Sequence, residues 1–187
     1  MAQYNGYVSV AHDTYQQWRD ATLGNGYNVD GAYGNQCWDF CALLWWQYGL
    51  RLITRPGGNG TAEDCWLISR DANAVPPFIA VYGVENIKRG DVVVFAGTTS
   101  YPTGHIAFAD QDYADRVNNR LNFLGQNQGQ GSSNPSNIAN LPLTNFLGIF
   151  RNTNWQAPEP PEPEEEKKKH KFPWVIAWNN WQNFKRY

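Results

Sequence analysis

Two residues of the sequence, Cys37 and His105, could together carry out nucleophilic catalysis. Cys37 follows a polar loop rich in Gly, Asn and Asp (residues 24–34) and opens an apolar run, so we expect it at the N-terminus of a buried helix. Helix-terminal N–H groups and the helix dipole favour the thiolate, the nucleophilic form of cysteine. Taken alone, Cys37 would be read as a small buried hydrophobe like Cys41. An activated thiol needs a base beside it, and of the three histidines only His105 is framed by apolar strand residues, so the pair predicts a thiol-dependent site.

A third side chain should hold the imidazole in its productive tautomer. The segment Leu121–Gln128, with the sequence LNFLGQNQ, offers Gln126 and Asn127. Alternation along a strand places Gln126 on the same face as Leu124, and this period of two does not by itself select Asn127. Both amides are therefore open as partners of the histidine.

The elements that must position these residues are helices first and strands afterwards. Residues 37–48 are apolar on nearly every side, which predicts a central buried helix with Asn35 as its N-cap and Gly49 just beyond its end. A shorter helix is expected over residues 11–22, and residues 51–85 read as loop-rich. Turn residues separate four candidate strands, at 91–96, 104–110, 120–126 and 145–151. This order predicts an α+β fold, with N-terminal helices packed on an antiparallel sheet or half-barrel.

The composition of the chain divides it into one domain and an appendage. With 187 residues, the chain is long enough for one domain that buries a sizeable core. We expect this domain over residues 1–155 and a linker rich in Pro, Glu and Lys over residues 156–171, because such a run cannot bury a core. Residues 172–187 form a separate aromatic tail that contains three Trp, two Phe and one Tyr.

The net charge, the cysteines and the hydropathy of the chain argue against nucleic-acid binding, a disulfide framework and a transmembrane helix. A formal net charge of -2 gives no electrostatic footprint for nucleic acid. The three cysteines form an odd set in a chain whose N-terminus lacks the features of a signal peptide, so free thiols made in a reducing cytosol are expected. No stretch reaches the ~18 apolar residues that a transmembrane helix needs.

Four motifs in order resemble the CHAP domain, a family of cysteine- and histidine-dependent amidohydrolases and peptidases found in phage and bacterial cell-wall lytic proteins. They are VDGAYGNQCWD at Val29–Asp39, GNGTA at Gly58–Ala62, GDVVVF at Gly90–Phe95 and GHIA at Gly104–Ala107. The resemblance implies a papain-like fold of the NlpC/P60 type. It also implies a peptidoglycan hydrolase, either an N-acetylmuramoyl-L-alanine amidase or an endopeptidase, encoded by a phage as an endolysin or a virion-associated tail lysin.

The same resemblance implies roles for individual residues. Cys37 attacks the carbonyl carbon, His105 accepts the thiol proton, and Gln36 helps to form the oxyanion hole, since a side-chain amide beside the nucleophile can donate to the developing negative oxygen. Asn127 aligns with the family's histidine-orienting asparagine. Gly125 then stands where the family commonly has a carboxylate, and this departure motivates an alternative: a catalytically weak or inactive CHAP-derived structural or binding component of a phage virion.

A calcium loop is a second implication of the resemblance, although no cofactor is expected to be required for the chemistry. The positions are Asn28, Asp30 and Asp39, with the backbone carbonyls of Ala32 and Gly34. Oxygen ligands of this kind suit Ca²⁺, and Asn in the first position lowers the ligand charge. The alternative is that Asp30 makes an Asx turn and Asp39 complements the helix N-terminus.

The expected partner is peptidoglycan, with two interpretations of the aromatic tail. Residues 172–187 either target the wall or a membrane surface through Trp side chains, or dock onto a phage structural protein. A protein made in the host cytoplasm without a signal peptide must reach the wall by lysis, through a pore or inside a phage particle.

Overall fold

The computed structural model describes residues 2–4, 7–9, 12–57, 60–99, 101–129 and 133–155. Residues 2–4 and 7–9 are described as backbone only. The predicted linker (156–171) and aromatic tail (172–187) lie outside the described residues, so the predicted domain boundary and the roles of the tail stay predictions.

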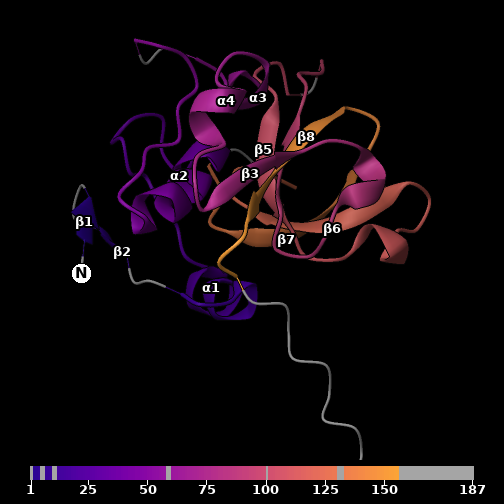
Figure 1. Cartoon of the computed structure of the whole chain (residues 1–187), viewed down its shortest axis with the longest axis horizontal. Helices are drawn as coiled ribbons and strands as arrows, with labels where there is room; N and C mark the ends of the chain where they lie inside the picture. Colours follow the sequence, from indigo (N-terminus) through magenta and orange to yellow (C-terminus); the bar gives the residue numbers. More distant parts are fainter. Residues whose placement is uncertain are drawn as a thin grey trace, which may run out of the picture. The chain divides into compact units, whose positions relative to one another are not determined.

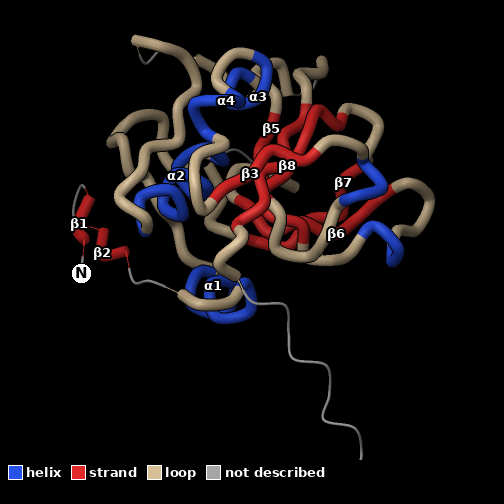
Figure 2. The backbone as a smooth tube through the Cα atoms, in the orientation of Figure 1, coloured by secondary structure: helices blue, strands red, loops and turns tan. Residues whose placement is uncertain are grey.

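One six-stranded antiparallel sheet forms the centre of the fold (Figures 1 and 2). Its strand order is β3-β8-β4-β5-β6-β7, so β4 and β5 lie in the middle and β3 and β7 at the edges. A separate two-stranded hairpin precedes it. The strands are β1 Ala2–Tyr4, β2 Tyr7–Ser9, β3 Phe78–Val81, β4 Val92–Phe95, β5 His105–Ala109, β6 Arg120–Gly125, β7 Asn137–Pro142 and β8 Phe146–Asn152.

Helix α2 (Cys37–Gln47) is the central helix and is buried along most of its length, as predicted. Its Trp45 ring stacks on Phe78 of the sheet with ring centroids 4.0 Å apart. Gly49 follows the helix with a φ of 71°, a left-handed conformation that glycine adopts without strain. The N-cap is Gln36, one residue later than the predicted Asn35, because the Gln36 N–H donates to the carboxylate of Asp39, 3.0 Å away.

The remaining helices are short. Helix α1 begins later than predicted because Thr14 caps it, accepting the N–H of Gln17 at 3.2 Å. The expected loop-rich middle of the chain contains further helical turns. The bounds are α1 Tyr15–Thr22, α3 Asp64–Leu67, α4 Arg70–Asn73 and the 3₁₀ turns η1 Val84–Asn86 and η2 Tyr113–Asp115. No helix within the described part of the chain is both long and apolar enough to cross a membrane.

The sheet is buried on both faces, so its central strands contact a hydrophobic cluster on each side. On β4, Val92 and Val94 join the cluster that contains the α2 side chains, whereas Val93 and Phe95 join a second cluster on the opposite face. All four strand residues are buried. The prediction of an α+β fold with helices on an antiparallel sheet is therefore confirmed.

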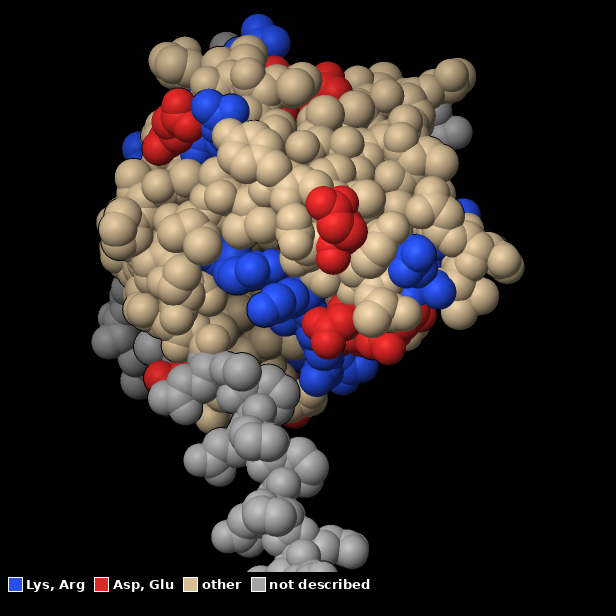
Figure 3. Space-filling view, turned by 45° about the vertical axis from the view of Figure 1, so that its right-hand side comes forward, with Lys and Arg blue, Asp and Glu red and all other residues tan. Residues whose placement is uncertain are grey.

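Ion pairs link α1 and β8 to residues at the ends of the central strands. Arg19 of α1 pairs with Asp110 at 2.9 Å, and Arg151 of β8 pairs with Asp91 at 2.8 Å. On the face drawn in Figure 3, basic and acidic side chains lie side by side on a surface that is otherwise largely uncharged.

Candidate active site

The structure brings the N-terminus of α2 against the start of β5, and so brings together the two predicted reactive residues. Cys37 is the first residue of α2 and His105 the first of β5. The backbone N–H of Ile106, the residue after His105, donates to the Cys37 sulfur. Both side chains are almost buried, each 7% exposed.

Gln128 is the residue that holds the imidazole. Its side-chain Oε1 lies 3.0 Å from Nε2 of His105. The Gln128 amide nitrogen donates to the carbonyls of Phe123 and Asn137, each at 2.8 Å, so both amide hydrogens are used. The oxygen is therefore the atom that faces the ring, and His105 must carry its proton on Nε2. In the neutral ring this leaves Nδ1 unprotonated, as a base requires.

Two aromatic rings limit the movement of the imidazole further. Phe95, the register partner of His105 on β4, stacks near it with centroids 6.4 Å apart. Tyr101 lies on the loop before β5 with its ring centroid 6.0 Å from that of the imidazole. His105 is thus held by one hydrogen bond and two ring contacts.

Burial sets the protonation states of the pair. It raises the pKa of the Cys37 thiol to about 11, although hydrogen bonds from the N–H groups of Ile106, Trp38 and Cys37 itself oppose the shift. Burial also lowers the pKa of His105, against the hydrogen bond to Gln128, which raises it. Loss of solvation thus opposes the helix-start N–H groups that were expected to favour a thiolate, and both pKa shifts favour the neutral forms of Cys37 and His105.

Asn127 occupies a different place from the one predicted for it. Its amide donates to Oε1 of Gln36 at 2.9 Å, and its own oxygen accepts the N–H of Ser133 at 2.8 Å. The residue bonded to His105 is Gln128, so the prediction that Asn127 orients the imidazole is wrong in geometry. The cause is the backbone at Asn127, whose φ of 52° ends the strand alternation and sends successive side chains in unrelated directions.

Gln36, the predicted oxyanion donor, directly precedes Cys37 and is held by hydrogen bonds. Its Nε2 donates to the carbonyl of Tyr33 at 2.6 Å, while its Oε1 accepts from Asn127. The bond to Tyr33 uses one of the two amide hydrogens of Gln36, so the second could donate to a substrate oxygen. The side chain is thus oriented from both of its ends.

Gln126, the other amide considered, hydrogen-bonds to the backbone of the loop that precedes Cys37. It is fully buried, accepts the N–H of Tyr27 at 2.6 Å, and donates to the carbonyls of Tyr27 at 2.9 Å and Gln36 at 3.0 Å. The three consecutive amide side chains therefore have different hydrogen-bond partners. Gln126 bonds to the loop backbone, Asn127 to the Gln36 side chain, and Gln128 to His105.

The predicted calcium loop is closed by its own hydrogen bonds. Asp39 Oδ1 accepts the N–H groups of Val29 at 2.9 Å and Asp30 at 3.3 Å, and Asp30 Oδ1 accepts the N–H of Ala32 at 2.8 Å, an Asx turn. Burial raises the pKa of Asp39 to about 6, with the negative charge of Asp30 adding to the shift. No group of three or more His, Cys, Asp or Glu side chains that could hold a metal occurs among the described residues. These bonds correspond to the alternative interpretation, and they give the loop a structure without an ion.

The other two cysteines are buried in the core near Cys37. All three cysteines are free. Cys41 and Cys65 are completely buried, and burial raises the pKa of both thiols above the ordinary value, with the charge of a Cys37 thiolate adding to the upward shift.

Comparison with known proteins agrees with this geometry. The model of the CHAP domain family matches residues 14–127, which include Cys37, His105 and the whole segment between them. The chain belongs to the CHAP domain family. Residues 128 and beyond, including Gln128, lie outside that match.

Two known proteins are similar to this CHAP domain. The D-alanyl-L-alanine endopeptidase of Streptococcus phage B30 is 34% identical over 138 residues, which are 70% of this chain and 28% of that protein. The chain thus spans little more than a quarter of the curated relative. The wild-type endolysin LysIME-EF1 has a similar fold, with a TM-score of 0.58 and 22% identity over 75% of this chain and 63% of that one.

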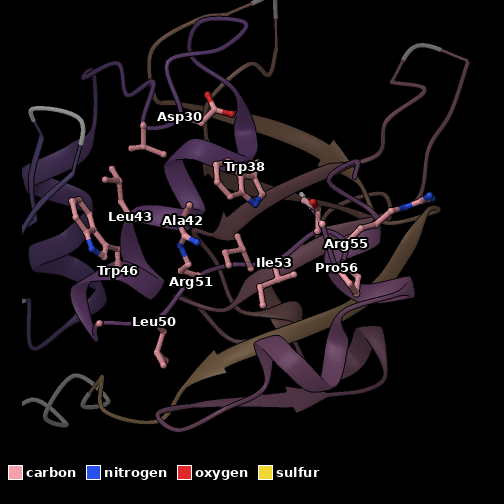
Figure 4. A pocket seen from close by; sticks show the side chains of 15 residues that line it. Asp30, Trp38, Ala42, Leu43, Trp46, Leu50, Arg51, Ile53, Arg55 and Pro56 are labelled. Atoms are coloured by element: carbon pink, nitrogen blue, oxygen red, sulfur yellow. The ribbon is translucent and has the colours of Figure 1, made fainter. Parts of the chain in front are cut away.

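A cavity of about 790 Å³ is lined in part by Trp38, the residue after Cys37 (Figure 4). One of its walls is a face of α2 with Trp38, Ala42 and Trp46, and the opposite wall is the segment from Gly49 to Gly57. Cys37 and His105 do not line it. Trp38 is the lining residue nearest to Cys37 in the sequence.

Proposed function

We propose that this domain hydrolyses an amide bond in the peptide part of bacterial peptidoglycan through a thiol mechanism. Cys37 is the nucleophile and His105 the base. The observation that carries the proposal is the hydrogen bond between Gln128 and Nε2 of His105, which leaves Nδ1 as the basic nitrogen of the ring. The next residue, Ile106, donates its backbone N–H to the Cys37 sulfur, so the base and the thiol lie close together. Family membership and the similarity to a phage endopeptidase support the choice of substrate.

The proposed reaction begins from the neutral pair. Nδ1 of His105 removes the thiol proton as the sulfur attacks the carbonyl carbon, so a C–S bond forms while the imidazole becomes positively charged. The imidazolium then returns its proton to the amide nitrogen, the C–N bond breaks, and an amine leaves. Water, deprotonated by the same imidazole, hydrolyses the thioester and restores the thiol. No cofactor is needed in these steps.

The negative oxygen of the tetrahedral intermediate needs donors on the side of the helix start. The first N–H groups of α2 have no partner within the helix, and Gln36 keeps one amide hydrogen in reserve. Such donors, fixed before the reaction, stabilise charge as it develops. Asn127 contributes indirectly, by holding Gln36.

Between the two activities implied by the family, we favour endopeptidase. The similar phage B30 protein is named a D-alanyl-L-alanine endopeptidase, and the similarity covers 70% of this chain. The cavity that Trp38 lines combines apolar side chains with Asp30, Arg51 and Arg55, a combination that suits a short peptide with charged ends. We propose this cavity as the seat for a stem or cross-bridge peptide.

The rival proposal is a structural component of a virion with little or no activity. Its motivation is Gly125, where the family commonly has a carboxylate. In this chain a different residue accepts the imidazole N–H, so the glycine does not leave His105 without an orienting partner. This favours the enzyme, acting on the wall as an endolysin or as part of a phage particle.

The experiment is digestion of purified cell walls, with released termini identified by mass spectrometry. New peptide amines without free muramoyl lactate would identify an endopeptidase, and free muramoyl lactate an amidase. Cys37→Ala is the inactive control, and Cys41→Ala, a fully buried cysteine on the same helix, is the matched active control. Walls of several hosts that release nothing with the native chain, under conditions where a known lysin acts, would contradict the enzyme proposal.

Calcium remains a proposal for the loop of Asn28, Asp30, Ala32, Gly34 and Asp39. Two neighbouring carboxylates, one of them with a raised pKa, would gain from a cation, while the backbone N–H groups already bonded to Asp39 compete with it. We therefore expect a weak structural site whose effect is on stability rather than chemistry.

A further inference from the structure

The end of β6 contains a glycine that the backbone does not require. Gly125 is the last residue of the strand, and its φ is not positive, so its backbone conformation is open to other residues. A Cβ at this position would lie 2.8 Å from Oε1 of Gln128 and 3.0 Å from Cβ of Ala107. A separation of 2.8 Å is shorter than real Cβ contacts allow, so the missing side chain at 125 provides space for the Gln128 amide.

The side chain of Gln128, three residues after Gly125, occupies the space that a side chain at position 125 would fill. The left-handed φ of 52° at Asn127 turns the backbone out of the strand, and the Gln128 amide then reaches back to the carbonyl of Phe123, five residues earlier. Gln128 is 2% exposed, and its second donor bond, to Asn137, ties it to β7. The amide is therefore fixed in orientation with its oxygen on His105.

We propose that Gln128 is the positioning residue of His105 and that Gly125 is the vacancy that admits it, so that a side chain at 125 and the bond from 128 exclude each other. The resemblance to the family places a carboxylate at 125, and here an amide oxygen that enters from position 128 takes over its function. This inference deepens the proposed function and rests on it for its effect on turnover.

The replacement of a carboxylate by an amide has a chemical consequence. A neutral oxygen accepts the Nε2 proton but does not compensate the positive charge of the imidazolium as a carboxylate would. The described ring and hydrogen-bond contacts of the imidazole are with Phe95, Tyr101 and the Gln128 amide, and none of these side chains is a carboxylate. The acidic residue beside the preceding Gly104 is Glu63, whose carboxylate accepts the N–H of Gly97 at 2.6 Å. The base should therefore stay unprotonated to a lower pH than it would beside a carboxylate.

The test is alkylation of Cys37 by iodoacetamide as a function of pH, with the modified residue identified by peptide mass spectrometry. This reaction needs the thiol and its base but no wall substrate, so it tests the positioning residue even if the proposed function is wrong. The variants are Gln128→Ala, Gly125→Glu and the double variant Gly125→Glu/Gln128→Ala. Gln16→Ala, an exposed glutamine on α1, is the matched control.

Each single variant is expected to slow alkylation at neutral pH about 10²-fold, the usual contribution of a positioned base. The double variant should regain rate relative to both singles, because the Glu carboxylate enters the space that Gln128 vacates, and its acid inflection should move to higher pH. Gln16→Ala should match the native chain. Native rate and inflection in Gln128→Ala, or single effects that simply add in the double variant, would overturn the proposal.

Nitrogen-15 spectra of the native chain provide a measurement that does not depend on a variant folding. The neutral ring of His105, assigned by comparison with His105→Gln, should show a protonated Nε2 and an unprotonated Nδ1. The opposite tautomer would overturn the proposal, whatever the outcome with walls.

Discussion

Asn127→Gly tests whether Asn127 acts on Gln36 or on His105. Glycine suits this perturbation because Asn127 has a φ of 52°, which glycine adopts freely, whereas alanine would add ~1–2 kcal/mol of backbone strain. The change removes two side-chain hydrogen bonds, to Gln36 at 2.9 Å and from Ser133 at 2.8 Å. The backbone path to Gln128 is retained.

The magnitude follows from these two bonds. At ~0.5–1.5 kcal/mol each they contribute about 2 kcal/mol, and the freedom that glycine adds to the unfolded chain costs ~0.4–1 kcal/mol more. A loss of roughly 2–3 kcal/mol should lower the melting temperature by about 4–12 °C for a domain of this size. Deleting an oxyanion donor costs ~10²–10³ in kcat, and because Asn127→Gly releases Gln36 without deleting it, we expect a loss of about tenfold with KM little changed.

The assay is a double-mutant cycle on a soluble muropeptide. Gln36→Ala should lower kcat by ~10²-fold, and Asn127→Gly should add nothing in that background, because the residue it positions is gone. A further tenfold loss in the double variant would refute the reasoning, since Asn127 would then act through another group such as His105. Full activity of Asn127→Gly beside a damaged Gln36→Ala would refute it equally.

Three other predictions concern the nucleophile, the base and the metal. Cys37→Ala should abolish the release of new termini from walls, measured by mass spectrometry, while Cys41→Ala keeps it; a Cys37→Ala enzyme with native activity would contradict the thiol mechanism. The pH profile of kcat/KM should fall only below 6.5, because burial lowers the pKa of His105 and the base is lost as pH falls through that lowered value, and it should stay level into alkaline solution, because the pKa of Cys37 is raised to about 11. Chelation should lower the melting temperature by only a few degrees, and Asn28→Asp should enlarge the calcium-dependent shift; melting curves that ignore calcium in both proteins would remove the site.

The central elements could be predicted from the sequence because a helix or strand that is buried on all sides has an uninterrupted run of apolar residues. The uninterrupted apolar run of α2 and the β-branched residues of β4 identify a helix and a strand enclosed on all sides. The edge strands β3 and β7 were missed. β7 has the sequence NIANLP with mixed exposure, since an edge strand pairs on one side only and need not alternate.

The approach of Cys37 to His105 was predictable from the sequence, and the residues that contact these two side chains were not. Cys37 and His105 stand at the starts of two predictable elements, so their approach follows from the packing of α2 on the sheet. The orienting residue depends on the turn after β6, where one left-handed residue decides whether Gln126, Asn127 or Gln128 faces the ring. Local alternation carries no information beyond a strand end, although the vacancy at Gly125 was a signal that a neighbour fills that place.

The protonation state of the nucleophile could not be read from its place on a helix. Position alone favours the thiolate, but the thiol is 7% exposed, and the cost of burying a charge exceeds the contribution of the surrounding N–H groups. Only the structure supplies that balance.

Capture of the acyl intermediate on Cys37 tests the central claim most directly. A soluble muropeptide is mixed rapidly with the native chain, the reaction is quenched in acid, and the protein is digested and analysed by mass spectrometry. We expect the acyl fragment of the cleaved substrate on the peptide that contains Cys37, and none with Cys37→Ala. Product formation without an adduct on Cys37, or with the adduct on another residue, would contradict nucleophilic attack by this thiol.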